Sequence, residues 1–111
     1  MKKDLLLLKI HKAVNEGKDF FEATRGNWKV SKKRFDYIQY VVGVNRGKIV
    51  CAFRPTKWDI IDDGRDKGRA FFDGLDAPKE VLIKLQNAED QLLKKFGSGN
   101  PVAYAMYSEI I

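Results

Sequence analysis

The sequence predicts a single α+β domain over residues 1–111, with a small, mixed, barrel-like β-sheet, an N-terminal helix and one long helix before the last strand. The length is the first indication, because a chain of 111 residues buries enough apolar surface for one hydrophobic core and not for two. The second is a pair of strand-like segments around a Gly-containing turn in the middle of the chain. The third is a set of apolar residues at helical spacing near the C-terminus.

The first segment is predicted to be a helix that runs from Asp4 to about Glu16. Asp4 can cap its first turn, and Gly17 is placed to end it. The residues that would form its apolar stripe are Leu6, Ile10, Ala13 and Val14. A short turn over Asp19–Thr24 follows, and then one or two helical turns capped by Ser31.

The leucine run Leu5–Leu8 resembles the start of a signal peptide, but Asp4 precedes it and Lys9 ends it after four residues. No stretch reaches the ~20 apolar residues of a membrane span. We therefore expect a cytoplasmic protein with no membrane partner. The exposed side of Leu5–Leu8 would offer a surface for a homodimer through the N-terminal helix.

The middle of the chain is predicted to be a β-hairpin. Tyr37–Val44 and Ile49–Phe53 are rich in β-branched and aromatic residues, and they flank a turn in which Gly47 supplies a positive φ. Both strands are nearly continuous in apolar residues, which indicates that both faces of the hairpin are covered. Pro55 cannot donate a hydrogen bond to a neighbouring strand, so the second strand is predicted to end there.

The last third of the chain is predicted to form a polar loop (62–69), a strand (69–73) and a long helix opened by Asp76–Pro78. The apolar residues at helical spacing are Val81, Leu85, Ala88, Leu92 and Phe96. A Gly-rich turn at 97–101 ends the helix, and the last strand covers 102–111.

The positive charge of the protein is concentrated in the central third. The net charge is +6 overall, but residues 25–58 carry +8, because they contain nine Lys or Arg and a single acid, Asp36. Residues 1–24 carry +1 and residues 59–111 carry −3. The same central third contains both tryptophans. Clustered positive charge with interleaved aromatic residues is typical of a nucleic-acid-binding surface, although a solvated lysine face is the simpler alternative.

Few residues suit catalysis or metal binding. His11 is the only histidine, and Cys51 is the only cysteine, placed mid-strand where a buried thiol is expected. We therefore expect no cofactor, no metal and no internal disulfide, and a binding protein rather than an enzyme. One alternative is a metal-dependent nuclease that uses the acidic cluster Asp59, Asp62, Asp63 and Asp66. Its spacing matches no ligand template, so a solvated loop is the favoured interpretation.

The residues suited to nucleic acid lie around the first tryptophan and beyond the hairpin. Lys and Arg neutralise phosphates, and an aromatic face stacks on a base with about 1–3 kcal/mol per base. The candidate ligand-binding residues are Thr24, Arg25, Asn27, Trp28, Lys29, Arg54, Trp58 and Asn100. For each tryptophan, packing in or beside the core is the alternative role.

Several segments together resemble a small prokaryotic domain of the PUA-like superfamily, near its ASCH and EVE groups. They span about residues 20–107, and they are 22–31 (EATRGNWKVS), 40–44 (YVVGV), 47–50 (GKIV), Phe53, Trp58, 72–74 (FDG) and 99–104 (GNPVAY). The N-terminal helix lies outside the resemblance, which makes it a local addition.

The resemblance implies a small barrel with flanking helices that binds RNA, or a modified base lifted out of a strand into an aromatic pocket. Thr24–Trp28 and Trp58 would line that pocket, with Asn100 nearby. The Lys- and Glu-containing signature of catalytically active ASCH proteins is not visible, so ribonuclease activity is not implied. We therefore expect a nucleic-acid-binding module. The alternatives are an accessory protein of a mobile element or defence system that binds a small nucleotide or a protein partner, and the metal-dependent nuclease.

Overall fold

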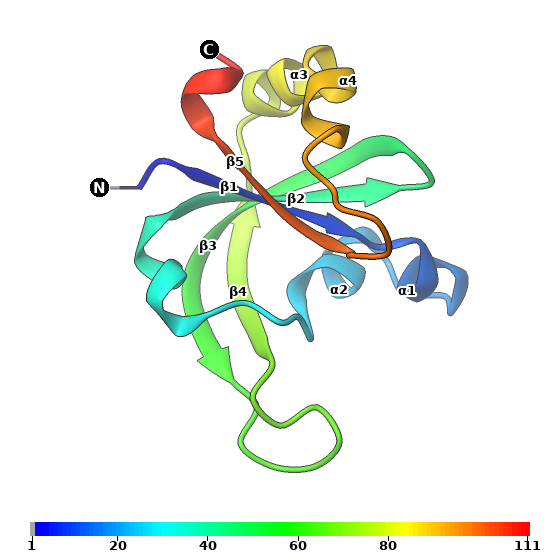
Figure 1. Cartoon of the computed structure of the whole chain (residues 1–111), viewed down its shortest axis with the longest axis vertical. Helices are drawn as coiled ribbons and strands as arrows, with labels where there is room; N and C mark the ends of the chain where they lie inside the picture. The colour runs from blue at the N-terminus through cyan, green and yellow to red at the C-terminus, as the bar shows by residue number, and fades with distance from the viewer. Residues whose placement is uncertain (1) are drawn as a thin grey trace.

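The computed structural model describes residues 2–111, which form one five-stranded mixed sheet flanked by short helices (Figure 1). The strands lie in the order β4-β3-β2-β1-β5. The elements along the chain are β1 (Asp4–Lys9), α1 (His11–Asn15), α2 (Phe20–Arg25), the 3-10 helix η1 (Lys32–Tyr37), β2 (Ile38–Asn45), β3 (Lys48–Ile60), β4 (Ala70–Asp76), α3 (Lys79–Asn87), α4 (Glu89–Leu93), β5 (Val102–Met106) and the 3-10 helix η2 (Tyr107–Glu109).

The N-terminal segment is a strand, so the predicted helix from Asp4 to Glu16 is wrong. β1 runs parallel to β2 and antiparallel to β5, and only the short helix α1 follows it. All four leucines of Leu5–Leu8 are 0% exposed. The segment is therefore an interior strand of the sheet, and the side chains of Leu5–Leu8 do not form the exposed surface that was expected for a homodimer.

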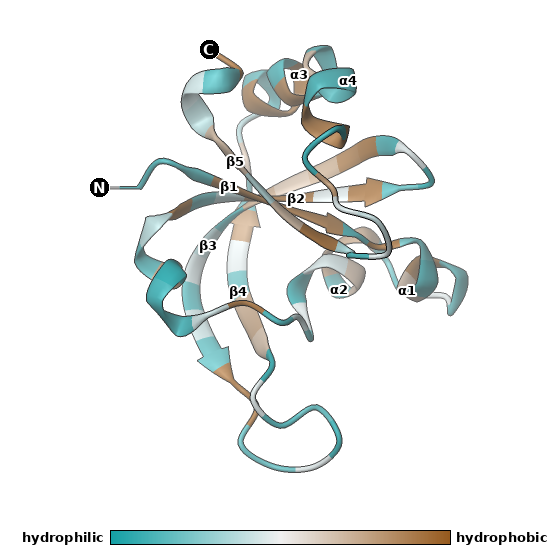
Figure 2. Cartoon of the chain, in the orientation of Figure 1, coloured by the Kyte–Doolittle hydropathy of each residue, from teal (hydrophilic) through white to brown (hydrophobic). Residues whose placement is uncertain are grey.

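The leucine run is explained by burial on both faces of the sheet. Alternate side chains of a strand point to opposite faces, and a central strand covered on both sides is apolar throughout. Leu5 and Leu7 belong to the apolar cluster under α3 and α4, whereas Leu6 and Leu8 belong to the cluster under α2. Figure 2 shows the resulting distribution, with hydrophobic strands in the middle and hydrophilic loops around them.

The α+β class is confirmed, but the sheet is not closed into a barrel. β4 and β5 lie at opposite ends of the strand order, with β3, β2 and β1 between them. The outer edge of β4 pairs with the segment that contains Trp28 and not with β5. The Trp28 N–H donates to the Ala70 carbonyl (2.9 Å), and the Ala70 N–H donates to the Trp28 carbonyl (2.8 Å). In a closed barrel β5 would pair with this edge of β4, and here the segment before η1 pairs with it instead.

The predicted hairpin is confirmed, with Arg46 and Gly47 in its turn at φ of 52° and 79°. The prediction that Pro55 ends the second strand is wrong, because β3 continues to Ile60. The register between β3 and β4 shifts between Pro55 and Lys57, and a proline is tolerated at such a bulge because its missing N–H is not needed.

The predicted long helix is two helices, α3 and α4, separated at Ala88. Side chains on either side of this break reach the part of β3 near the hairpin turn, where β3 is not paired with β4. The Glu89 carboxylate accepts from the Ile49 N–H (2.7 Å), and the Gln86 amide donates to the Ile49 carbonyl (3.1 Å). The last strand also ends earlier than predicted, at Met106. None of the helices within residues 2–111 is long and apolar enough to span a membrane.

Gly43 of β2 offers a test of how tightly the face under α2 is packed. A Cβ atom at Gly43 would collide with the Cys51 Sγ and lie 2.9 Å from the Thr24 Oγ1 and 3.1 Å from the Ile10 Cδ1. We expect Gly43→Ala to lower the free energy of unfolding by about 1–3 kcal/mol, as overpacking of a core does, measured by urea unfolding. Gly97→Ala is the matched control, since nothing lies within 4 Å of its added Cβ. Equal midpoints for the two variants would contradict this description of the packing.

Candidate nucleic-acid interface

Trp28 lies at the centre of a concave surface formed where the segment before η1 runs beside β4. Its backbone is fixed by the two hydrogen bonds with Ala70, and its indole N–H donates to the Thr24 carbonyl (2.8 Å). The side chain is half-buried and packs against the cluster under α2. The ring is therefore held in one orientation while part of it remains open to solvent.

The first hollow beside Trp28 has a volume of about 460 Å³ and is closed by the Gly-rich turn before β5. Its lining residues are Trp28, Lys29, Arg69 and Ser98–Val102. The side-chain carbonyl of Asn100 accepts from the Val102 N–H (3.0 Å), which orders the turn. The Asn100 amide NH2 is then the end of this side chain that can donate to a ligand.

A second hollow, of about 570 Å³, adjoins the first and is strongly cationic. It shares Lys29 and Arg69 with the first hollow and adds Arg65 and Lys67 from the loop between β3 and β4. Within the described part of the chain, no acidic side chain lines it. Arg69 also lies 4.0 Å from the Asp66 carboxylate, so the other three cations, Lys29, Arg65 and Lys67, are the ones that favour an anion, because clustered positive charge focuses the local field.

A third hollow, of about 780 Å³, extends from Trp28 towards α1. It shares Trp28, Arg69 and Asn100 with the first hollow. We call the three hollows together the basic groove. The basic residues that line it are Lys9, Lys12, Lys18, Lys29, Arg65, Lys67 and Arg69, and the acidic ones are Glu16 and Asp66. The groove is thus more positive than its surroundings and contains one accessible tryptophan.

A polar network fixes the loop 61–69 against the segment that carries Trp28. The Asn27 amide donates to the Asp66 carboxylate (3.0 Å), and Arg69 donates to the Asn27 carbonyl (3.3 Å). Arg69 also lies 4.0 Å from Asp66. Asp66 therefore has a structural role between Asn27 and Arg69, and the cationic side chains of the loop are presented from a fixed backbone.

The structure brings four of the eight predicted ligand-binding residues together in the basic groove and places four elsewhere. Those in the groove are Asn27, Trp28, Lys29 and Asn100. Thr24 is 0% exposed and donates to the Phe20 carbonyl (2.6 Å). Arg54 is exposed on β3 and lines none of the three hollows.

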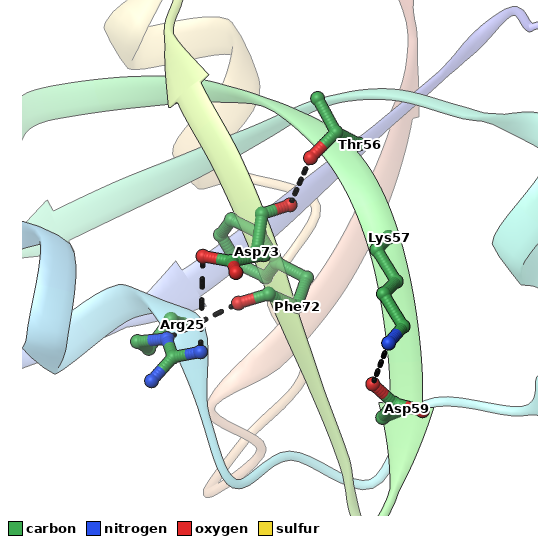
Figure 3. Close-up of polar contacts among 6 residues, drawn as sticks. All are labelled: Arg25, Thr56, Lys57, Asp59, Phe72 and Asp73. Atoms are coloured by element: carbon green, nitrogen blue, oxygen red, sulfur yellow. Dashed lines mark hydrogen bonds and ion pairs between the residues drawn. The ribbon is translucent and has the colours of Figure 1, made fainter.

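Arg25 and Trp58 are occupied by contacts with the protein itself. Figure 3 shows the Arg25 guanidinium turned towards β4, where Nε donates to the Phe72 carbonyl (3.2 Å) and an Nη lies 3.9 Å from the Asp73 carboxylate. Trp58 stacks on Phe35 with ring centres 4.8 Å apart, and it contacts Phe72 at 5.2 Å. Trp58 therefore packs against the core, whereas Trp28 borders the groove.

Three carboxylates of the acidic cluster, those of Asp59, Asp63 and Asp66, have local partners instead of a shared centre. Asp59 pairs with Lys57 (3.6 Å), as Figure 3 shows, and Asp63 accepts from the Gly64 N–H (2.7 Å). Among residues 2–111, no group of three or more His, Cys, Asp or Glu side chains is arranged to hold a metal ion. The basic residues of the same loop, Arg65, Lys67 and Arg69, were not predicted as site residues, and they line the groove.

Cys51 is buried against Gly43, as the sequence predicts for a mid-strand cysteine. Burial raises the pKa of its thiol above the ordinary value, more than the side-chain contact with Thr24 lowers it. Little thiolate is then present near neutral pH, and the thiolate is the reactive form. We expect Cys51 to react with a disulfide reagent at pH 8 at least about tenfold more slowly in the native protein than in urea, measured by absorbance. Equal rates would show that the thiol is accessible.

Comparison of the chain with protein-family models, with curated protein sequences and with solved structures found no match. The basic groove is therefore interpreted from its own residues, charge and shape.

Proposed function

We propose that the protein binds nucleic acid in the basic groove, with one unstacked base against Trp28 and the sugar–phosphate backbone along the cationic walls. The observation that carries the proposal is the position of Trp28. It is a half-buried, oriented indole that lines two of the three hollows, and the groove formed by all three is lined by seven Lys or Arg side chains and two carboxylates.

Each part of the groove has a defined role in this proposal. Lys29, Arg65 and Lys67 are exposed and contact phosphates, because they line the hollow that contains no carboxylate. Trp28 stacks on the base, and the Asn100 amide donates a hydrogen bond to a base edge or a sugar oxygen. The hydrogen bond from the Trp28 indole to the Thr24 carbonyl holds the ring in place before the ligand arrives.

An unstacked base is favoured over an intact duplex because Trp28 lies in a concave surface. A ring in a hollow stacks only on a base that has left its helix, at a cost of a few kcal/mol for a paired base and less for a single strand. The resemblance to PUA-like domains supports the same ligand class, including a modified base. The open sheet departs from the barrel that this resemblance implies.

The second candidate function is binding of a free nucleotide. Two observations favour it. The hollow beside Trp28 has the size of a small-ligand site, and it adjoins the hollow that is lined by four cations. The base of one nucleotide would fill the first hollow, and its phosphates would fill the second. Affinity that does not grow from a mononucleotide to a 12-nucleotide strand would support this candidate.

The proposal is tested by fluorescence anisotropy with labelled 12-nucleotide single strands of DNA and RNA. If four phosphates are neutralised, affinity should fall about 50-fold between 50 and 200 mM salt, because log K falls with log salt at a slope of about −0.7 per phosphate contact for single strands. Tryptophan fluorescence should be quenched on binding, and Trp28→Phe should reduce the quenching. Binding that is insensitive to salt would contradict the role of the cationic walls.

A further inference from the structure

A separate hollow of about 400 Å³ lies along the edge of β3 before its pairing with β4 begins, between α2 on one face of the sheet and α3 on the other. Its floor is the backbone and side chains of Cys51, Ala52 and Phe53, which are 5–7% exposed. Its walls come from the first turn of α2 and from α3. The volume is in the range of a hollow that holds one small ligand or one large side chain.

The walls of this hollow are apolar and partly unprotected from water. Phe20 is 41% exposed, and Phe21, Val50 and Leu82 are half-buried. Phe21 is held in place by an edge contact with Phe53, with ring centres 5.1 Å apart. A large aromatic side chain that remains open beside a rigid apolar floor gives favourable free energy to any apolar group that covers it.

The rim of the hollow is acidic, in contrast to the net charge of +6 for the whole chain. Among the lining residues in the described part of the chain, Asp19 and Asp76 are acidic and Lys79 is basic. Glu22 and Glu80 are exposed in the first turns of α2 and α3 beside these residues. An apolar cavity bordered by carboxylates is complementary to an apolar group that carries positive charge next to it.

The apolar hollow and the basic groove have no lining residue in common. α2 contributes Phe20 and Phe21 to the apolar hollow and Ala23 to the basic groove, so the two sites lie against different sides of this helix. Both can therefore be occupied at the same time.

We propose that the apolar hollow docks a segment of a partner protein in which a large apolar side chain is flanked by Lys or Arg. The apolar side chain fills the space over Ala52 between Phe20 and Leu82, and the flanking cations approach Asp19 and Asp76. Such an arrangement would let the protein connect a bound nucleic acid to a second protein. The docking site itself does not depend on nucleic-acid binding.

The test uses two capped hexapeptides, KKLFKK and EELFEE, titrated into isotope-labelled full-length protein and followed by amide chemical shifts. We expect KKLFKK to shift amides within 19–22, 50–53 and 76–82, and EELFEE to leave these unshifted. Asp19→Asn with Asp76→Asn should weaken the KKLFKK complex about two- to thirtyfold, as loss of two exposed ion pairs would. Asn at position 19 retains the cap that Asp19 provides to the Glu22 N–H (2.8 Å), so α2 should persist.

The matched control is Asp62→Asn with Asp63→Asn, which removes the same charge from exposed positions that line none of the hollows described. This control should leave KKLFKK binding unchanged. Equal weakening by both double variants, or shifts from KKLFKK outside the hollow, would overturn the proposal. Equal binding of EELFEE at the hollow would overturn its charge selectivity, and self-association of the protein through Phe20 would identify a second copy as the occupant instead.

Discussion

Replacing Leu7 by Asp should leave the chain unable to fold. Leu7 is 0% exposed in β1, an interior strand of the sheet, and pairs with Val42 on one side and Ala103 on the other. Truncation of such a leucine to alanine alone costs about 2–5 kcal/mol, and a buried carboxylate without a partner adds a desolvation cost. The total is comparable with the whole free energy of unfolding of a small domain, about 5–15 kcal/mol. Circular dichroism and urea unfolding would measure the loss.

Leu75→Asp is the matched control for this prediction. Leu75 lies in β4 and is 58% exposed, so the same substitution removes little buried surface and leaves the charge in water. We expect its unfolding midpoint to stay close to that of the unmodified protein. If Leu7→Asp unfolded at the same urea concentration as Leu75→Asp, the N-terminal segment would not be a buried interior strand of the sheet.

The triple variant Lys29→Gln, Arg65→Gln and Lys67→Gln should lose most of the affinity for single-stranded nucleic acid. Each phosphate contact contributes roughly fivefold at 0.1 M salt, so three lost contacts lower the affinity about 100-fold. The slope of log K against log salt should become shallower by about 2. All three side chains are exposed, so the fold should be retained.

The control for the triple variant removes three other exposed lysines, through Lys3→Gln, Lys84→Gln and Lys94→Gln. These residues line none of the hollows of the basic groove. The net charge changes by the same amount, so a general effect of charge would weaken both variants equally. Equal loss in the two variants would locate binding outside the groove, whereas a loss confined to the first supports it.

The elements that sequence predicts correctly are those determined by local chemistry. The hairpin between β2 and β3 follows from a turn in which Gly47 adopts a positive φ between two β-branched segments. The Ser31 cap of η1 is of the same kind, since its hydroxyl accepts from the Lys33 N–H (3.3 Å). Neither feature depends on which distant segment packs against it.

The N-terminal strand could not be assigned in this way, because a four-residue apolar run fits a buried strand and a buried helix equally well. The choice between them is made by β2 and β5, which pair with Leu5–Leu8 from more than thirty residues away in the sequence. The division of the predicted long helix at Ala88 has a similar origin. On either side of the break, Gln86 and Glu89 form hydrogen bonds with the backbone of Ile49, which is distant in the sequence.

The sequence predicts only one of the two walls of the candidate site. Trp28 and Lys29 lie within the basic central third of the sequence. The cations of the opposite wall lie in a loop that contains as many acidic as basic residues, so its net charge is zero. In that loop Asp62, Asp63 and Asp66 offset Arg65, Lys67 and Arg69 in any count of charge along the chain. In space Asp63 turns back to the Gly64 N–H, and Asp66 lies between Asn27 and Arg69. The exposed cations Arg65 and Lys67 then line a hollow to which none of the described carboxylates contributes.

The bonding at the outer edge of β4 has a consequence for solubility. An unpaired strand edge is a template on which other chains can add strands and aggregate. Here the Trp28 backbone occupies that edge at Ala70, and the Arg25 guanidinium occupies it at Phe72. The segment proposed to meet the ligand therefore also shields the sheet from self-addition. A nucleic acid that holds this segment in place should slow aggregation on heating, since a ligand that binds only the native state raises its stability.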